Sequence, residues 1–280
     1  MKRAQIILVS VGLLLFIGLL FFGKTVNPNK QITAAKPTSA QTTILFADIL
    51  STSKEKLTAE QNARLTSLEN SVVRGDVQNQ KIHVYHELAT FWKDSAKAFE
   101  PYAYYTAEAA KLDNSEKSLT FAAQLFIDNL LAENEPTMQN WLASNGKVLL
   151  EKALEINPAN DSSKISLGAC YILGNISDQP MQGILPVREI ATKNPDNLYA
   201  QLVLGLGGKK SGKYDKSIER FGIIVKKNPN DLGAMFQLAE CYELKGDKKN
   251  AITWYQMIQK IIPNPEAKKE LQDRINQLNG

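Results

Sequence analysis

Two histidines are the residues whose types and spacing come closest to suggesting metal chemistry. His83 and His86 lie in the segment KIHVYHE, and Glu87 follows one helical turn after His83. A zinc site usually needs three or four ligands, and no other cluster of cysteine, histidine or acidic residues has ligand spacing. We therefore expect two partly exposed histidines on a helix, with no metal and no other cofactor.

A second candidate for chemistry is the segment GLGGKKSGK at residues 205–213, which is rich in glycine and lysine, as phosphate-binding loops are. It lacks the G-x-x-x-x-G-K-[ST] order of those loops. We interpret it as the end of one helix and the turn to the next. Gly207 and Gly208 should each cost that helix about 1 kcal/mol relative to alanine, so we expect local fraying and, as a hypothesis, a hinge.

The chain has two cysteines, Cys170 and Cys241, which are 71 residues apart. This separation is the sum of two intervals of the repeat described below, 37 and 34 residues. The two thiols should therefore occupy the same position in the first helix of two repeats that have one other repeat between them. Helices pack 8–10 Å apart, which places the two thiols roughly 20 Å from each other, beyond disulfide reach. No histidine or lysine is placed to activate either thiol. We expect free, buried thiols and a protein that is not an enzyme.

The charge of the folded body is predicted to be close to neutral. The 280 residues include 33 basic and 29 acidic side chains, a net charge of +4. Five of the basic residues precede the first acidic residue, Asp48, which leaves 28 basic against 29 acidic residues. A nucleic-acid-binding protein needs a broad positive surface, so nucleic acid is not an expected partner.

The amino terminus predicts a membrane anchor. Residues 6–22 carry no charge and follow Met1-Lys2-Arg3. As a helix they would span roughly 26 Å, close to the ~30 Å hydrocarbon core of a bilayer. A cleaved signal peptide is the alternative, but its apolar region is usually shorter and is closely followed by small residues at a cleavage site. We therefore predict an uncleaved single-pass signal anchor, one transmembrane helix at residues 1–23.

Basic residues near this anchor predict the side of the membrane on which the body lies. Lys2 and Arg3 favour a cytoplasmic amino terminus, although Lys24 and Lys30 weaken that signal. The body would then lie in the periplasm, tethered to the bacterial inner (cytoplasmic) membrane. Residues 24–43 are polar and contain two prolines, so we expect a flexible linker.

Prolines recur at a regular interval in the second half of the chain. Pro195, Pro229 and Pro263 follow one another at 34 residues, and Pro158 precedes Pro195 by 37. Between the last two prolines, apolar or small residues recur at helical spacing in two stretches, separated by the turn residues 245–247. The residues in this pattern are Met235, Leu238, Ala239, Tyr242, Ala251, Ile252, Tyr255 and Ile258. Each unit therefore predicts a helical hairpin.

This pattern resembles the tetratricopeptide repeat (TPR), a helix-turn-helix unit of 34 residues. Leu204-Gly205 and Leu238-Ala239 match the bulky and small pair of its first helix, and Phe221 and Tyr255 match an aromatic position of its second helix. The resemblance implies an all-α fold, a right-handed α-solenoid of stacked hairpins preceded by the transmembrane helix.

The resemblance weakens toward the amino terminus. The unit that ends at Pro195 has three extra residues in its turn, and Pro186 in its second helix predicts a kink or a late helix start. Upstream, residues 115–135 and 145–158 predict one hairpin, and residues 81–95 and 99–115 predict another, after a helix near residues 57–73. The predicted divisions are 44–78, an N-terminal helical segment; 79–158, divergent TPR-like repeats; 159–263, TPR repeats; and 264–280, a C-terminal capping helix.

In the family that this chain resembles, partner segments bind in a concave groove lined by the first helices. Carried over position by position, the groove residues are Ile165, Ala169, Ile172 and Leu173, then Tyr199, Leu202, Leu206, Lys209 and Lys210, and then Phe236, Glu240, Glu243 and Leu244. The groove should be apolar at its centre, with charges of both signs toward one end. Packing between repeats is an equal alternative for Ile165 and Leu202. These two residues and Phe236 stand where a chaperone-binding clamp would need Lys or Asn, so that activity is not expected.

The resemblance implies a membrane-tethered scaffold that binds a protein or peptide and has no catalysis. It is similar to anchored repeat proteins that help assemble envelope complexes, including cytochrome c maturation factors. The alternative is an enzyme or sensor component with a small-molecule pocket in residues 44–135. Its support is a high density of aromatic residues, which core packing also explains, so no small-molecule substrate is expected. These residues are Tyr85, Phe91, Trp92, Phe99, Tyr102, Tyr104 and Tyr105.

Overall fold

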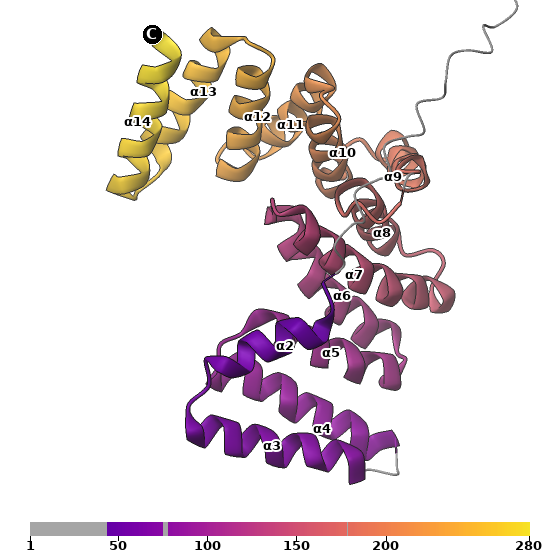
Figure 1. The fold of residues 1–280 in the computed structure, drawn as a ribbon. Coiled ribbons are helices and arrows are strands. Elements are labelled where there is room, and N and C mark those ends of the chain that lie inside the picture. Colours follow the sequence, from indigo (N-terminus) through magenta and orange to yellow (C-terminus); the bar gives the residue numbers. More distant parts are fainter. Residues whose placement is uncertain (1–43, 75–77, 178) are drawn as a thin grey trace, which may run out of the picture. The chain divides into compact units, whose positions relative to one another are not determined.

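The computed structural model describes residues 44–74, 78–177 and 179–280, and every regular element within them is a helix (Figure 1). The predicted anchor at residues 1–23 and the predicted linker at residues 24–43 lie outside the described residues. Within the described ranges, no helix is both long enough and apolar enough to cross a membrane. The helices are α2 (Phe46–Glu55), α3 (Ala59–Arg74), α4 (Gln78–Thr90), continued by a π-helical turn (Phe91–Ser95), α5 (Phe99–Asp113), α6 (Glu116–Ala132), α7 (Pro136–Ile156), α8 (Asp161–Leu173), α9 (Met181–Lys193), α10 (Leu198–Lys210), α11 (Tyr214–Lys227), α12 (Leu232–Leu244), α13 (Lys248–Ile261) and α14 (Pro265–Asn279).

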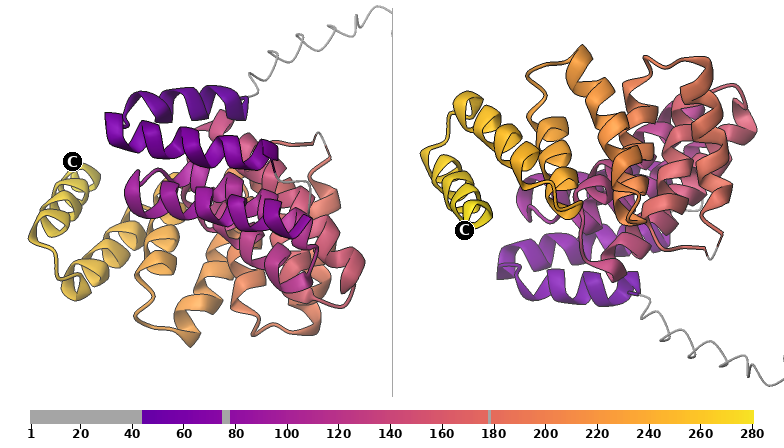
Figure 2. Two further views of the ribbon diagram at one scale, coloured as in Figure 1. Left: turned by 90° about the horizontal axis from the view of Figure 1, so that it is seen from below. Right: turned by 90° about the horizontal axis from the view of Figure 1, so that it is seen from above.

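From α4 onward the helices pack in chain order, each against the one before it (Figures 1 and 2). They form successive hairpins, α4 with α5, α6 with α7, α8 with α9, α10 with α11, and α12 with α13, and α14 packs on α13. The first helices α6, α8 and α10 also contact one another in sequence. The all-α fold and the helical hairpins predicted from the proline interval are confirmed.

The repeat interval reappears in the caps of the first helices. Asn160, Asn197 and Asp231 each accept a hydrogen bond from the backbone N–H three residues later, at 3.0, 3.0 and 2.9 Å. These N-caps start α8, α10 and α12, and they are separated by the same 37 and 34 residues as the prolines. The turns after α10 and α12 contain Gly212 and Gly246, 34 residues apart, at φ values of 70° and 86°. Glycine adopts this conformation without strain, so the turns are equivalent.

The buried residues form three hydrophobic clusters along the hairpins, because one face of each helix is apolar. Phe221 and Tyr255, the predicted aromatic pair of the second helices, are both buried. On α14, which packs on α13, Leu271 and Ile275 are buried and most of the other residues are exposed, the pattern of a terminal helix with a polar outer face.

The amino-terminal part contains more helix than the sequence indicated. Residues 44–74 contain two helices, α2 and α3, where the sequence indicated one helix near residues 57–73. A capping box starts α3: the Gln61 N–H donates to Thr58 Oγ1 at 3.2 Å, and the Thr58 N–H donates to Gln61 Oε1 at 2.9 Å. Helix α7 begins at Pro136, nine residues before the predicted start at 145, because proline is favoured in the first turn of a helix.

Pro186 predicted a kink or a late start for the second helix of the repeat that ends at Pro195, but helix α9 does not start late. It runs from Met181 to Lys193 with Pro186 in its interior, and its first turn follows Pro180 directly. Pro186 is exposed, so the Gln182 carbonyl that loses its helical partner lies on the solvent side, where water can satisfy it.

Candidate functional site

The first group of predicted groove residues is buried. Ile165, Ala169, Ile172 and Leu173 on α8 are between 0% and 7% exposed. They belong to the main hydrophobic core because α6 and α10 both pack against α8. The structure therefore places these four side chains mainly in packing between repeats, the alternative considered for Ile165.

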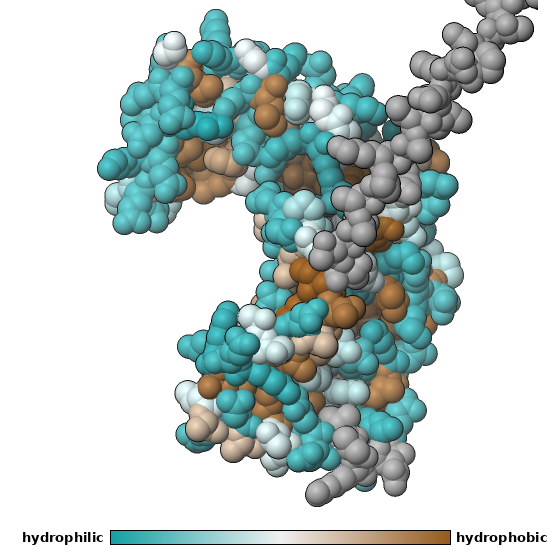
Figure 3. Space-filling model, viewed as in Figure 1, coloured by the Kyte–Doolittle hydropathy of each residue, from teal (hydrophilic) through white to brown (hydrophobic). Residues whose placement is uncertain are grey.

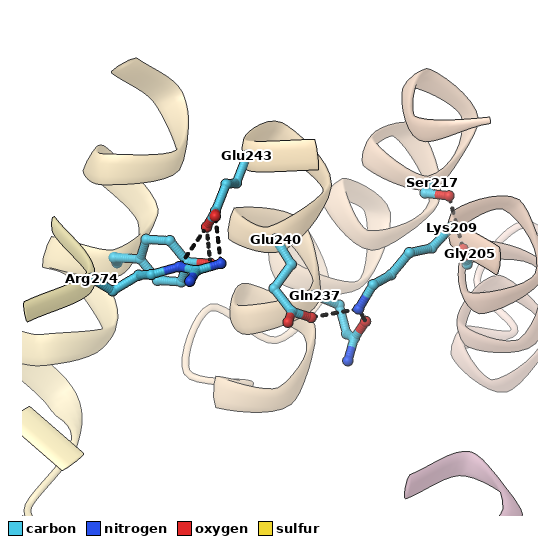
Figure 4. A network of polar contacts seen from close by, with 8 residues as sticks. Gly205, Lys209, Ser217, Gln237, Glu240, Glu243 and Arg274 are labelled. Carbon is cyan, nitrogen blue, oxygen red and sulfur yellow. Dashed lines mark hydrogen bonds and ion pairs between the residues drawn. The ribbon is translucent and has the colours of Figure 1, made fainter. Parts of the chain in front are cut away.

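The charged groove residues are paired within the protein (Figure 4). Lys209 Nζ on α10 donates to Gln237 Oε1 at 2.8 Å and to Glu240 Oε2 at 2.5 Å, both on α12. Glu243 on α12 accepts two hydrogen bonds from the Arg274 guanidinium of α14, at 3.0 and 2.5 Å. These two pairs connect α10 with α12 and α12 with α14, so the charges that the sequence assigned to the groove also connect neighbouring helices.

Further polar contacts hold α8 and α10 together. Lys210 Nζ donates to the carbonyl of Leu173, which is the last residue of α8 and lacks a helical partner for that group. Burial lowers the pKa of Lys210. The Tyr199 hydroxyl on α10 lies 2.9 Å from the Ser166 hydroxyl on α8, and burial raises the pKa of Tyr199 to about 12.

One apolar hollow opens between α10 and α12, where the first helices contact each other less closely than α8 and α10 do. We call it the α6–α12 hollow; its volume is about 430 Å³. The predicted groove residues Tyr199, Leu202 and Leu206 line it. The other lining residues are Asp128, Leu131, Ala132, Leu198, Ile224, Asn228, Asp231, Gly233, Ala234 and Gln237.

A second hollow, the α12–α14 hollow, lies on the other side of α12 and has a volume of about 420 Å³. Two predicted groove residues line it: Phe236, which is 40% exposed, and Glu240. The Phe236 ring packs edge-on against Tyr255, with centroids 5.9 Å apart. The remaining lining residues are Tyr255, Ile258, Ile262, Ala267, Glu270, Leu271 and Arg274. Figure 3 shows apolar surface, in brown, among the hydrophilic surface of the α12 to α14 region.

The sequence prediction missed the contribution of α14. Arg274 lies 34 residues after Glu240, so one further step of the repeat would have placed it at the same groove position. The remaining predicted groove residue, Leu244, is 53% exposed and lines neither hollow.

The cysteines and histidines considered for catalysis and metal binding line neither of the hollows described above. Cys170 and Cys241 are free and buried, as predicted, and burial raises their pKa to about 12 and about 11. His83 is exposed and lies 3.6 Å from Glu87. Within the described ranges, no group of three or more histidine, cysteine or acidic side chains is arranged to hold a metal ion.

Most of the aromatic residues behind the small-molecule alternative pack into the core of α2 to α5. The rings of Phe46 and Tyr104 are stacked with centroids 3.4 Å apart, and Tyr105 contacts both. Phe91 and Trp92, in the π-helical turn, are at most 1% exposed. Ring packing therefore accounts for this aromatic density.

Comparison with known proteins gives likenesses of fold. No family model matches the sequence. A crystal structure of MamA protein is 17% identical, with 64% of this chain and 90% of that chain covered and a TM-score of 0.44. YrrB, described as a TPR protein with an unusual peptide-binding site, is 14% identical, with 74% of this chain and 97% of that chain covered and a TM-score of 0.44. A tetratricopeptide repeat protein from Parabacteroides merdae is 16% identical, with 79% of this chain and 88% of that chain covered and a TM-score of 0.41. The identities are below 25% and the TM-scores below 0.5, so the roles of these proteins are not transferred to this chain.

Proposed function

We propose that this protein is a non-catalytic scaffold that binds a segment of another protein across α12. The observation that supports this is the pair of apolar hollows on the two sides of that helix. Phe236 is exposed in one hollow, and Leu202 and Leu206 line the other. Lys209 and Glu243 beside them are already paired, with Glu240 and with Arg274, so apolar contact is what a partner would gain at this part of the surface.

Carboxylates that have no cationic partner in the described part of the chain define the chemistry of the partner. Asp128 and Asp231 line the α6–α12 hollow, and Glu270 lines the α12–α14 hollow. None of the three forms an ion pair within the described residues, and the one cation in the two linings, Arg274, is bound to Glu243. The rims are therefore negative. We expect the partner segment to carry two bulky apolar side chains with lysine or arginine close by.

Peptide selection tests this proposal. Peptides selected from a random display library against the purified full chain should combine bulky apolar residues with lysine or arginine. Phe236→Glu and Leu202→Glu should each weaken binding of a selected peptide at least about tenfold, which corresponds to ~1.4 kcal/mol. Both variants place a carboxylate in an apolar hollow, so circular dichroism and urea titration must first show that they are folded.

Leu185→Glu is the matched control. Leu185 is an exposed apolar residue of α9 that lines neither hollow, and the substitution makes the same change in charge and size. The proposal is wrong if folded Phe236→Glu and Leu202→Glu bind the selected peptides as tightly as Leu185→Glu does, or if the selected peptides share no apolar anchors.

We further propose that residues 1–23 tether this scaffold to the bacterial inner membrane, with the body in the periplasm. The support is the uncharged run of residues 6–22 after Lys2 and Arg3. Fusion of a phosphatase that is active only in the periplasm to the carboxyl terminus should give activity, and the fusion should stay in the membrane fraction after alkaline extraction. Release by alkali would contradict the tether. An inactive fusion would contradict the location of the body in the periplasm. A role in assembly of an envelope complex, as in cytochrome c maturation, stays a prediction.

A further inference from the structure

A third hollow lies apart from the proposed peptide surface, among α8, α9, α10 and α11, and its lining is cationic. Its volume is about 450 Å³. Among the residues that the structure describes, Arg188, Lys213, Lys216 and Arg220 line it, and no acidic side chain does. The other lining residues are Ile172, Ile184, Leu204, Gly207, Gly208 and Ser211. We call it the cationic hollow.

The charge of this hollow is not neutralised by its surroundings. Among the described residues, Arg188 and Lys213 form no ion pair, and Lys216 has only Glu219, at 3.5 Å on the exposed face of α11. Such an exposed pair contributes about 0–1 kcal/mol and holds the lysine weakly. Arg220 donates to the buried Gln201 Oε1 at 2.8 Å, a neutral partner that orients the guanidinium and leaves its charge in place.

The nearest acidic residues along α9 and α11 have other partners. Glu189 accepts a hydrogen bond from Lys193 at 2.6 Å, and Asp215 lies 2.5 Å from Lys245 Nζ. Both carboxylates are therefore already paired with a lysine that does not line the hollow. The four cations of the hollow are left to attract an anion from solution.

The backbone around the hollow adds to this attraction. The last carbonyls of α10 would repel an anion, but Ser211 Oγ donates to Gly207 O at 2.8 Å and Lys213 N–H donates to Gly208 O at 2.8 Å. Ser217 Oγ donates to Gly205 O at 2.8 Å (Figure 4). The amino-terminal end of α11 begins beside Lys213, and its helix dipole favours negative charge.

The glycines of this segment serve packing. A Cβ on Gly207 would lie 2.5 Å from Ile172 Cγ2, and one on Gly208 would lie 2.5 Å from Ser217 Oγ. The close approach brings α10 onto α8 and α11 and places Ile172 and Leu204 in the floor of the hollow. Ile172 is buried and Leu204 is half-buried, whereas Arg188, Lys213 and Lys216 are exposed, so the floor of the hollow is apolar and its rim is cationic.

We propose that the cationic hollow binds a small organic phosphate. The phosphate would contact the Arg188 guanidinium and the Lys213 and Lys216 ammonium groups, and the organic part would lie against Ile184 and Leu204. Arginine and lysine are the side chains that bind phosphate oxygens most strongly, through charge-assisted hydrogen bonds. The volume lies within the range of about 300–1,000 Å³ that small-molecule sites occupy. This proposal does not depend on the peptide surface.

Titration calorimetry with phenyl phosphate and with inorganic phosphate tests the proposal. The full chain should bind phenyl phosphate with one site, more tightly than inorganic phosphate, because only the ester can reach the apolar floor. Arg188→Gln with Lys213→Gln should reduce the affinity at least tenfold. Neither side chain donates a hydrogen bond within the described residues, so the variant is expected to fold.

Lys226→Gln with Lys249→Gln is the control, because it removes the same charge from two exposed lysines outside the hollow. The proposal is overturned if phenyl phosphate shows no saturable binding, or if the control variant loses as much affinity as Arg188→Gln with Lys213→Gln. Equal affinity for phenyl phosphate and inorganic phosphate would also overturn it, since the apolar floor would then contribute nothing. Tighter binding of a short phosphotyrosine peptide than of phenyl phosphate would point to a phosphorylated protein and overturn the small-molecule assignment.

Discussion

Replacing Glu243 by glutamine should weaken the attachment of α14 to α12, and the structure gives the size of the effect. Glu243 accepts two hydrogen bonds from Arg274 and one from the Tyr255 hydroxyl, at 2.9 Å. The Glu243 side chain is 18% exposed and that of Arg274 is 52% exposed. Exposed ion pairs contribute about 0.2–1 kcal/mol, and a bidentate, half-buried pair belongs at the upper end.

We therefore expect a coupling free energy of about 1 kcal/mol in a double-mutant cycle of Glu243→Gln and Arg274→Gln. Glu243→Gln alone should lower the free energy of unfolding by about 1–2 kcal/mol, because Arg274 and Tyr255 then lose a charged acceptor. Urea titration of the four proteins, followed by circular dichroism, gives the cycle, and hydrogen exchange should show loss of protection concentrated in α14.

The coupling should also shrink in about 1 M salt, where the Debye length falls to ~3 Å. A coupling indistinguishable from zero at low salt would refute the assignment of these charges to the scaffold. So would a value that does not respond to salt, or exchange that rises evenly through all helices.

Three further predictions concern packing and ionisation. Phe221→Ala removes a fully buried ring from α11 and should cost about 3–5 kcal/mol in urea titration; a cost below about 1 kcal/mol would contradict the core assignment. Gly207→Ala should destabilise the protein by about 1–3 kcal/mol through its contact with Ile172, whereas Gly222→Ala, in α11 with nothing within 4 Å of the added Cβ, should stabilise it by about 0.5–1 kcal/mol; equal effects would contradict the packing. Burial raises the pKa of Cys170 from 9.0 to about 12, so the unfolded chain loses this proton first and the free energy of unfolding should fall as pH rises from about 9 to about 12; urea midpoints measured across that range should decrease, and Cys170→Ala should reduce the decrease.

The hairpin order could be predicted from the sequence because it depends on local signals that repeat. Prolines, N-caps and the aromatic pair at Phe221 and Tyr255 recur at one interval, and each acts within its own hairpin. Accessibility could not be predicted in this way, because it depends on how closely the first helices approach each other. Ile165 and Phe236 were assigned to the same groove, yet neighbouring helices cover the first and leave the second partly exposed.

The pairing of the charges could not be predicted for a related reason. The sequence indicated that Lys209 and Glu243 share one position of the repeat, but the partner of each lies on the following hairpin, 31 residues further along. The cationic hollow was also missed, because its residues come from four helices and no short motif contains them. The start of α2 and the early start of α7 were missed because they lie upstream of the regular repeats.

The two ion pairs between the first helices have opposite polarity, and this makes the hairpins non-interchangeable. Position 209 carries lysine and its counterpart 243 carries glutamate; position 240 carries glutamate and its counterpart 274 carries arginine. A chain that folded with one hairpin skipped would bring Lys209 against Arg274, two cations where the native order places a cation and an anion. The order of the hairpins is thus specified by the covalent chain and also by the alternating charges. An internal deletion of the 34 residues of one repeat would leave a continuous chain but would place Lys209 against Arg274.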